Sequence, residues 1–218
     1  MPRNLSEAEI KEFRDRVCAV AEKLFAERGP QGVTMRELAR AMGVSAMTPY
    51  RYFDRKEEIL ALVRTSAFER FAEALERAAA IKGNAVERAR AVGKAYVDFA
   101  FKQPDAYKLM FDVNQPDAAR FPELVQAGRR ARLTMSGYLK DLIAEGILIG
   151  DADSLGRIFW AMVHGLVMLH LTGKLDPKPD FTTLYDTAMR LLGRGTHVTA
   201  SREQERKKEN VMKNRKAS

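Results

Sequence analysis

The side chains best suited to specific polar contacts with a large ligand lie between residues 33 and 53. Apolar residues at helical spacing are expected to face inward there: Val33, Leu38, Ala39, Met42, Val44 and Phe53. The side chains left to face outward are Arg36, Ser45, Ala46, Met47, Thr48, Tyr50, Arg51 and Tyr52. Guanidinium and hydroxyl groups bond to phosphates and base edges, and small side chains allow close approach. This segment therefore has the chemistry of a nucleic-acid reader.

Two short helices and a tight turn are expected to position these side chains. Thr34 and Glu37 form a capping-box pattern, and Gly43 can supply the left-handed residue that ends the helix after Met42. Ser45 is expected to cap a second short helix that contains the two tyrosines. A longer helix precedes them, so the pattern predicts a helix-turn-helix, whose second helix enters a major groove about 12 Å wide.

Pro49 conflicts with a regular second helix. It falls four residues after Ser45, lacks a backbone N–H, and disfavours the helical conformation at Thr48. We therefore expect either a helix that starts at Thr48 or a distorted first turn.

The rest of the chain is predicted to be helical, because apolar residues recur at helical spacing and sustained alternation of period two is absent. The first helix opens at Ser6 and closes at Gly29, and breaks follow wherever glycine and proline accumulate. Further helices are expected at residues 54–80, 85–103, 105–111, 122–145, 153–172 and 181–194. The fold class is thus all-α, with domains at residues 1–57 and 58–195 and a basic tail at 196–218 that has too few apolar residues to fold.

Charge alone does not locate a DNA-binding surface. The formal net charge is +8, and residues 201–218 contribute half of it with seven Lys or Arg against three Glu. The single cysteine, Cys18, excludes an internal disulfide and fits a reducing cytoplasm. The first residues are not followed by the apolar run that a secretory leader requires. We expect a cytoplasmic protein.

Other classes of function find little support in the sequence. It contains no GxGxxG after a strand, GxSxG, HExxH or P-loop pattern, so no enzyme and no cofactor are predicted. His164 and His170 are six residues apart on different helix faces, so no zinc site is predicted. Residues 155–171 are almost long enough to span a membrane, but the two histidines and Arg157 would be costly in lipid, which favours a buried or interface helix.

The stretch LFAERGPQGVTMRELARAMGVSAMTPYRYFDRKEEIL resembles the TetR family of bacterial regulators. The resemblance implies that Thr34, Tyr50 and Lys56 contact DNA phosphates. It also implies that bases are read by Arg36, Ala46, Met47, Thr48 and Arg51. Ser45, in the turn, belongs to the same DNA-binding set, and Tyr52 is expected at the edge of the groove. Packing in the core is the alternative for both tyrosines, and it competes more closely for Tyr52.

WAMVHG at residues 160–165 resembles the Trp-x-x-x-His-Gly signature of one C-terminal domain type in this family, and PDAYKLMF fits the same type. The resemblance implies a homodimer joined by its last two long helices, which binds a palindromic operator and leaves it when a small-molecule effector binds. Repression is the family's commonest mode of regulation. The helix at residues 54–80 would then be the lever, and Gly156 and Gly165 would permit close approach between subunits.

Bulky side chains in the second domain could line an apolar effector pocket. The predicted set is Tyr96, Phe99, Tyr107, Met110, Phe111, Tyr138, Trp160 and His164, and Met168 belongs to the same reservoir. Core packing is the alternative for each one, and a structural hydrogen bond is the alternative for His164. A regulator that senses a protein, or nothing, is the alternative function.

Overall fold

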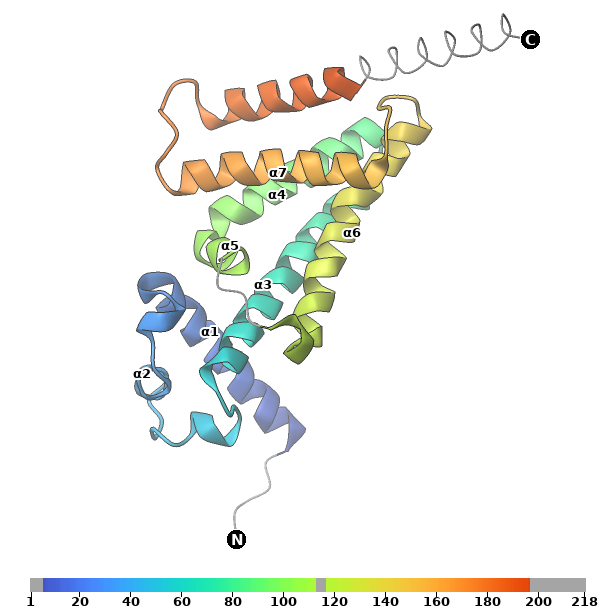
Figure 1. Ribbon diagram of the computed structural model, residues 1–218. Helices are drawn as coiled ribbons and strands as arrows, with labels where there is room; N and C mark the ends of the chain where they lie inside the picture. Colours follow the sequence, from blue (N-terminus) through green and yellow to red (C-terminus); the bar gives the residue numbers. More distant parts are fainter. Residues whose placement is uncertain (1–5, 113–116, 197–218) are drawn as a thin grey trace, which may run out of the picture. The chain divides into compact units, whose positions relative to one another are not determined.

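The computed structural model describes residues 6–112 and 117–196, and this part of the chain is helical without strands (Figure 1). The α-helices are α1 Glu7–Arg28, α2 Met35–Ala41, α3 Lys56–Ala79, α4 Ala85–Lys102, α5 Pro104–Met110, α6 Pro122–Ala144, α7 Ala152–Leu171 and a last helix at residues 181–196. Short 3-10 turns are η1 Pro30–Gly32, η2 Pro49–Arg51 and η3 Ala118–Arg120. The predicted all-α class is confirmed. The predicted tail lies outside the described residues from position 197 onward.

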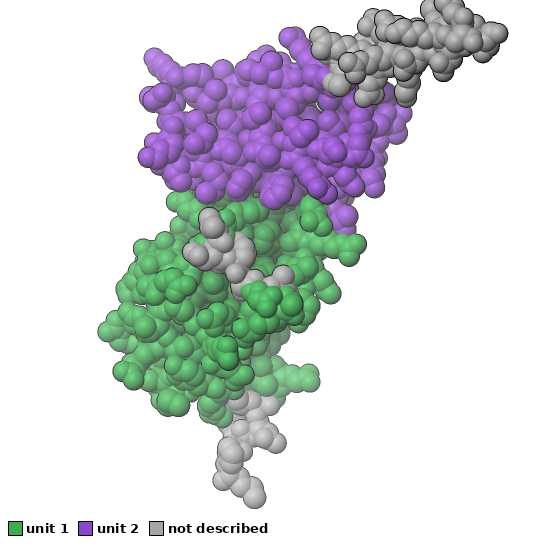
Figure 2. Space-filling view, in the orientation of Figure 1, with its two compact units in different colours: residues 1–75, 98–132 green, residues 76–97, 133–218 purple. Residues whose placement is uncertain are grey.

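The chain forms two compact units, which Figure 2 colours separately. Unit 1 comprises Met1–Leu75 and Asp98–Arg132, and unit 2 comprises Glu76–Val97 and Leu133–Ser218. Helices α3, α4 and α6 therefore each contribute residues to both units. These units are defined by packing within the chain, and the predicted division into functional domains at residue 57 stays a prediction.

The ends of α1 and α2 form as the sequence predicts. Ser6 and Thr34 each accept a hydrogen bond from the backbone N–H three residues on, at 3.2 Å, while Glu9 and Glu37 accept from the capping residues' own N–H. Gly43 adopts a φ of 67°, its N–H donates to the carbonyl of Arg40, and the next N–H donates to that of Ala39. These two bonds make a Schellman turn, which fixes where α2 stops.

The core of unit 1 fastens the short helices to α1 and α3. Five of the six residues predicted to face inward are buried, and Val44 is partly buried against them. Leu109 of α5 belongs to the same cluster, and α5 packs on α1. A helix from the middle of the chain therefore helps to support the N-terminal helices.

Unit 2 contains a close approach of α6 and α7. A Cβ atom added at Gly156 would lie 3.3 Å from Cβ of Ser136 and 3.4 Å from Leu139. Gly156 is buried against α6 of its own chain, which corrects the expectation that it permits approach of a second subunit, whereas Gly165 has open space at its Cβ position.

Helix α7 is long and apolar enough to cross a membrane if length and composition are the sole criteria. Several large apolar side chains on it are exposed, namely Ile158, Met162 and Leu169, and Arg157 and His170 are exposed too.

Candidate functional site

The loop after the Schellman turn, residues 45–53, carries most of the predicted DNA-contacting side chains, and we name it the reading segment. It contains the 3-10 turn η2, not the α-helix that a cap at Ser45 would begin. Ser45 instead accepts a bond from the N–H of Met47 at 3.4 Å. The expected start at Ser45 is therefore wrong, and Pro49 is the reason, because it lacks the N–H that an α-helical bond to Ser45 requires.

Thr48 departs from a second expectation. It adopts helical angles, φ −62° and ψ −46°, despite the proline that follows. Its N–H donates to the carbonyl of Ser45 at 2.9 Å, and its own carbonyl accepts from Arg51 at 3.1 Å. The steric preference that proline imposes on the preceding residue is outweighed here by two turn hydrogen bonds and by the burial of the Pro49 ring.

The structure exposes most of the predicted DNA-contacting residues. Tyr50 is 49% exposed and Met47 is 67% exposed, which is unusual for large apolar side chains. The other exposed members are Thr34, Arg36, Ser45, Ala46 and Arg51, while Thr48, Tyr52 and Lys56 are half-buried. The exposed members lie at the N-cap of α2, on α2 itself and in the reading segment, within unit 1.

Tyr52 does not face outward with the others. Its ring stacks on that of Phe13 in α1, with centroids 3.9 Å apart and planes inclined by 21°. It also packs against the core of unit 1. The expectation of an outward-facing ring is corrected, because the apolar face of Phe13 offers the ring a partner that solvent does not. The place of Tyr52 at the edge of the groove stays a prediction.

Two predicted phosphate ligands already have protein partners. The ammonium of Lys56, the first residue of α3, donates to the carbonyl of Pro30 at 2.6 Å. The hydroxyl of Thr34 donates to Glu37 at 2.9 Å and accepts from its N–H. Hydrogen bonding to Thr34 lowers the pKa of Glu37, so this carboxylate stays charged at neutral pH. Both residues help to fix the geometry around α2.

Sequence reasoning missed the residues of α1 that support the reading segment. The guanidinium of Arg14 lies 5.0 Å from the ring centre of Phe53, and that of Arg16 donates to the carbonyl of Met42 at 3.5 Å. Phe13 stacks on Tyr52, and nothing local in the sequence pairs these two residues. These contacts join residues far apart along the chain, so spacing within α1 could not reveal them.

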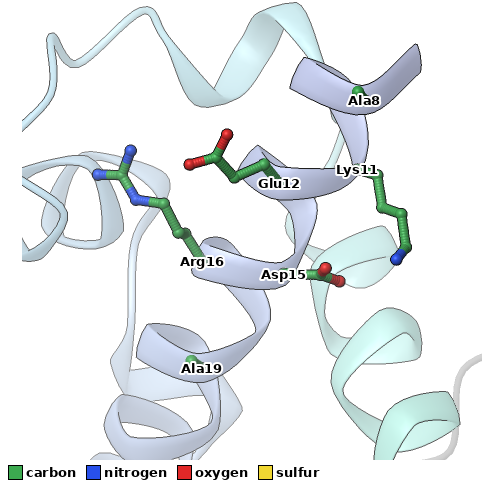
Figure 3. A pocket seen from close by; sticks show the side chains of 6 residues that line it. All are labelled: Ala8, Lys11, Glu12, Asp15, Arg16 and Ala19. Atoms are coloured by element: carbon green, nitrogen blue, oxygen red, sulfur yellow. The ribbon is translucent and has the colours of Figure 1, made fainter.

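Figure 3 shows a groove along an exposed face of α1, next to these contacts. It is lined by Ala8, Lys11, Glu12, Asp15, Arg16 and Ala19, with the side chains of both signs pointing away from the helix. None of these residues belongs to the predicted effector pocket.

Arg70 is a second residue that the sequence did not reveal. Its three guanidinium nitrogens donate to Glu22 at 2.7 Å, to Gln103 at 3.0 Å and to Ser66 at 2.9 Å. Gln103 precedes α5, and Glu22 lies on α1. One guanidinium in unit 1 thus connects α1, α3 and the junction between α4 and α5.

The predicted effector-lining residues do not fall in a single compact unit. Phe99, Tyr107, Met110 and Phe111 belong to unit 1, where Tyr107 and Met110 are buried and the rings of Tyr107 and Phe111 meet edge to face at 5.0 Å. Tyr96, Tyr138, Trp160 and His164 belong to unit 2. Phe99, Tyr107 and Met110 therefore pack in the core, and Phe111 is half-buried beside Tyr107.

In unit 2, Tyr96 joins the residues of the Trp-x-x-x-His-Gly pattern. The indole N–H of Trp160 donates to the Tyr96 hydroxyl at 3.1 Å, and that hydroxyl lies 3.4 Å from Nδ1 of His164. Burial lowers the pKa of His164, so the imidazole is neutral at neutral pH. Burial is the main cause that raises the pKa of Tyr138, and the electrostatic influence of Tyr185 adds to it. The Tyr138 hydroxyl therefore stays protonated. We name Tyr96, Trp160 and His164 the Tyr96 cluster.

Metal binding finds no support in residues 6–112 and 117–196. They contain no group of three or more His, Cys, Asp or Glu side chains placed to hold an ion. Cys18 is buried in unit 1, where desolvation raises the pKa of its thiol.

Two family descriptions match this chain. Residues 17–63 match "Bacterial regulatory proteins, tetR family", and residues 89–192 match "Tetracyclin repressor-like, C-terminal domain". The second description does not specify the Trp-x-x-x-His-Gly type, so that subtype stays a prediction.

Similar proteins share a stretch of sequence with this chain or its fold. An uncharacterized HTH-type transcriptional regulator of Mycobacterium tuberculosis is 47% identical over 45 residues, which is 21% of this chain and 22% of that protein. A solved Rhodococcus protein of unknown function is 29% identical, with a TM-score of 0.73, and covers 90% of this chain and 98% of its own. The regulator FadR of Bacillus subtilis, solved with stearoyl-CoA, is 20% identical, with a TM-score of 0.69, over 83% and 98% of the two chains.

Proposed function

We propose that this chain, which belongs to the TetR family of bacterial transcriptional regulators, binds a palindromic operator as a homodimer and leaves it when a small apolar effector binds. The family's members are DNA-binding helix-turn-helix regulators and not enzymes. Repression is the mode of action that we propose, in the cytoplasm.

The observation that carries the proposal is the Schellman turn at Gly43, which separates α2 from the exposed reading segment. Arg36 on α2 and Met47 and Tyr50 beyond the turn are exposed in the same unit. An arginine can bond two acceptors of guanine, and an apolar side chain can contact a thymine methyl group. Tyr50 is proposed to contact a phosphate, as are Thr34 and Lys56. The residues proposed to read bases are Arg36, Ala46, Met47, Thr48 and Arg51.

A second copy of the chain is proposed to cover α7. Ile158, Met162 and Leu169 are all exposed on this helix, and their spacing of four and seven residues places them on one face. A two-fold axis would let this face meet itself and would present two reading segments to two half-sites. Gly165, with open space at its Cβ position, lies on the same helix and is compatible with a close subunit contact.

The effector is proposed to contact the Tyr96 cluster in unit 2. Trp160 and His164 are each half-buried, so they combine apolar surface with polar atoms that can orient a ligand. FadR, which shares the fold, was solved with stearoyl-CoA. The acyl chain of such a ligand is apolar although its coenzyme A part is charged, so acyl-CoAs are the first ligands to test. Helix α3 contributes residues to both units, and we propose it as the lever whose tilt changes the half-site separation.

Selection of bound duplexes from a random pool tests the DNA-binding proposal. We expect the winners to be palindromic, with half-sites about one helical turn apart or a multiple of it. The absence of any enriched sequence, across ionic strengths and without added effector, would contradict it.

Thermal denaturation with a series of saturated acyl-CoAs tests the effector proposal, with free coenzyme A as the control. A ligand that binds the native state raises the melting temperature in a concentration-dependent way. We expect stabilisation by an acyl-CoA but not by coenzyme A, together with release of the selected duplex. A regulator without a small-molecule effector would show neither change with any compound in a wider screen.

A further inference from the structure

The reading segment has little backbone structure of its own. Its hydrogen bonds join Thr48 to Ser45, Arg51 to Thr48, and both Tyr52 and Phe53 to Pro49, and Pro49 itself has no N–H to donate. Such 3-10 turns have poorer hydrogen-bond geometry than an α-helix, and a single turn is not stable alone. Contacts from outside the segment must therefore define its shape.

One stretch of α1 supplies two of those contacts, in addition to the packing of η2 on α2. Phe13 stacks on Tyr52 at 3.9 Å, Arg14 lies over the ring of Phe53 at 5.0 Å, and both phenylalanines are buried, with 8% and 2% of their surfaces exposed. Tyr52 and Phe53 are the last two residues of the reading segment. Its C-terminal end is therefore held by side-chain packing on α1, while the stretch from Ala46 to Met47 is exposed.

We propose that Tyr52 is a positioning residue for DNA recognition. Its ring, stacked on Phe13, holds the reading segment in the shape that exposes Met47 and Tyr50, and its hydroxyl is dispensable for binding DNA. Tyr50, two residues earlier and 49% exposed, has the opposite role and makes the direct contact. The inference rests on the proposed operator binding for its functional consequence, whereas the packing role belongs to the free protein.

Three variants separate the ring from the hydroxyl. Tyr52→Phe keeps the stack and removes the hydroxyl, Tyr52→Leu removes the stack at a half-buried position, and Phe13→Leu removes it from the other side. Tyr50→Leu is the matched control for loss of a neighbouring ring that is exposed. Circular dichroism and urea unfolding establish that each variant is folded.

Hydrogen exchange in the free protein tests the packing role. We expect the amides of Thr48, Arg51 and Phe53 to exchange about two- to tenfold faster in Tyr52→Leu and in Phe13→Leu, the range that follows from the strength of an aromatic pair. Tyr52→Phe and Tyr50→Leu should exchange like the wild type. Unchanged exchange in folded Tyr52→Leu would overturn the proposal, whether or not a DNA target is known.

Binding to the duplex selected from the random pool tests the consequence for recognition. Tyr52→Phe should bind it within about twofold of the wild type, while Tyr52→Leu should lose about tenfold or more, a loss comparable to that for a mismatched base pair. Affinity for an unselected duplex should change little, because phosphate contacts dominate it.

Two outcomes of the binding experiment have different meanings. Equal losses for Tyr52→Phe and Tyr52→Leu on the selected duplex would assign the effect to the hydroxyl and overturn the inference. A wild-type protein that enriches no duplex would contradict the proposed function instead, and hydrogen exchange alone would then decide the packing role.

Discussion

The reading segment and the Tyr96 cluster are built from the sequence in different ways. The first begins with a capping box, a glycine and a proline within twenty residues of one another, and packing of Tyr52 and Phe53 on α1 completes it. The second consists of hydrogen bonds from Tyr96 to partners 64 and 68 residues away. Local signals can specify a turn, because each acts on a neighbouring backbone group. A distant hydrogen bond exists only after the helices have packed. The two regions should therefore respond differently to small changes.

Packing around unit 2 offers the largest expected effect. A methyl group added at Gly93 of α4 would collide with the Tyr185 hydroxyl oxygen of the 181–196 helix. We expect Gly93→Ala to lower the free energy of unfolding by about 1–3 kcal/mol, as overpacking does. Urea denaturation monitored by circular dichroism measures the change.

The same geometry provides a rescue of that variant. The Tyr185 ring carbon that bears the hydroxyl lies 3.5 Å from the added Cβ position, an ordinary contact. Tyr185→Phe removes the hydroxyl that the added methyl group would meet. It should therefore restore most of the stability lost in Gly93→Ala. If the double variant is no more stable than Gly93→Ala, the collision is not the cause.

The reading region offers the next effect, on binding rather than folding. Tyr50→Ala should weaken binding to all duplexes alike, by about tenfold, because a phosphate contact carries no sequence information. Arg36→Ala should weaken the selected duplex and change the preferred bases. Competition binding with single-base variants of the duplex distinguishes the two, and a uniform loss for Arg36→Ala would remove it from the base-reading set.

Much of the fold could be predicted because its signals are local. The caps at Ser6 and Thr34 and the left-handed Gly43 fix helix ends through bonds to adjacent residues, and these ends form as predicted. Helical periodicity also identified the buried side of the N-terminal helices, from Val33 to Phe53. Both kinds of signal need no knowledge of the tertiary structure.

The candidate site could be predicted only in part, for the same reason. Exposure of Met47 and Tyr50 follows from their place in an amphipathic pattern, but the stack of Tyr52 on Phe13 depends on how α1 crosses the segment. The shape of the reading segment also depends on Pro49, which lacks the N–H for an α-helical bond to Ser45 but does not keep Thr48 out of the helical region. The turn hydrogen bonds of Thr48 decide that outcome. The predicted effector residues were grouped by size alone, which cannot assign them to separate units.

Loss of the α2 cap tests how far local signals alone hold the reading region. Thr34→Ala removes the acceptor for the N–H of Glu37 and should lower the free energy of unfolding by about 1 kcal/mol. Thr34→Ser keeps the hydroxyl and should remain near the wild type. A loss in Thr34→Ser as large as that in Thr34→Ala would attribute the effect to the methyl group, and hence to packing.

Acidification should produce the smallest effect, and in the other region. Burial lowers the pKa of His164 below its ordinary value of 6.5, so the unfolded chain takes up a proton more readily than the folded one. The stability that follows from this difference is complete above pH 6.5 and is lost as the pH falls from 6.5 toward the folded pKa. His164→Gln has no such group, and the other two histidines are common to both proteins. The difference in unfolding free energy between wild type and variant should therefore decrease between pH 7.5 and 5.5. A constant difference would mean that the imidazole near Tyr96 is as easily protonated in the folded protein as in the unfolded chain.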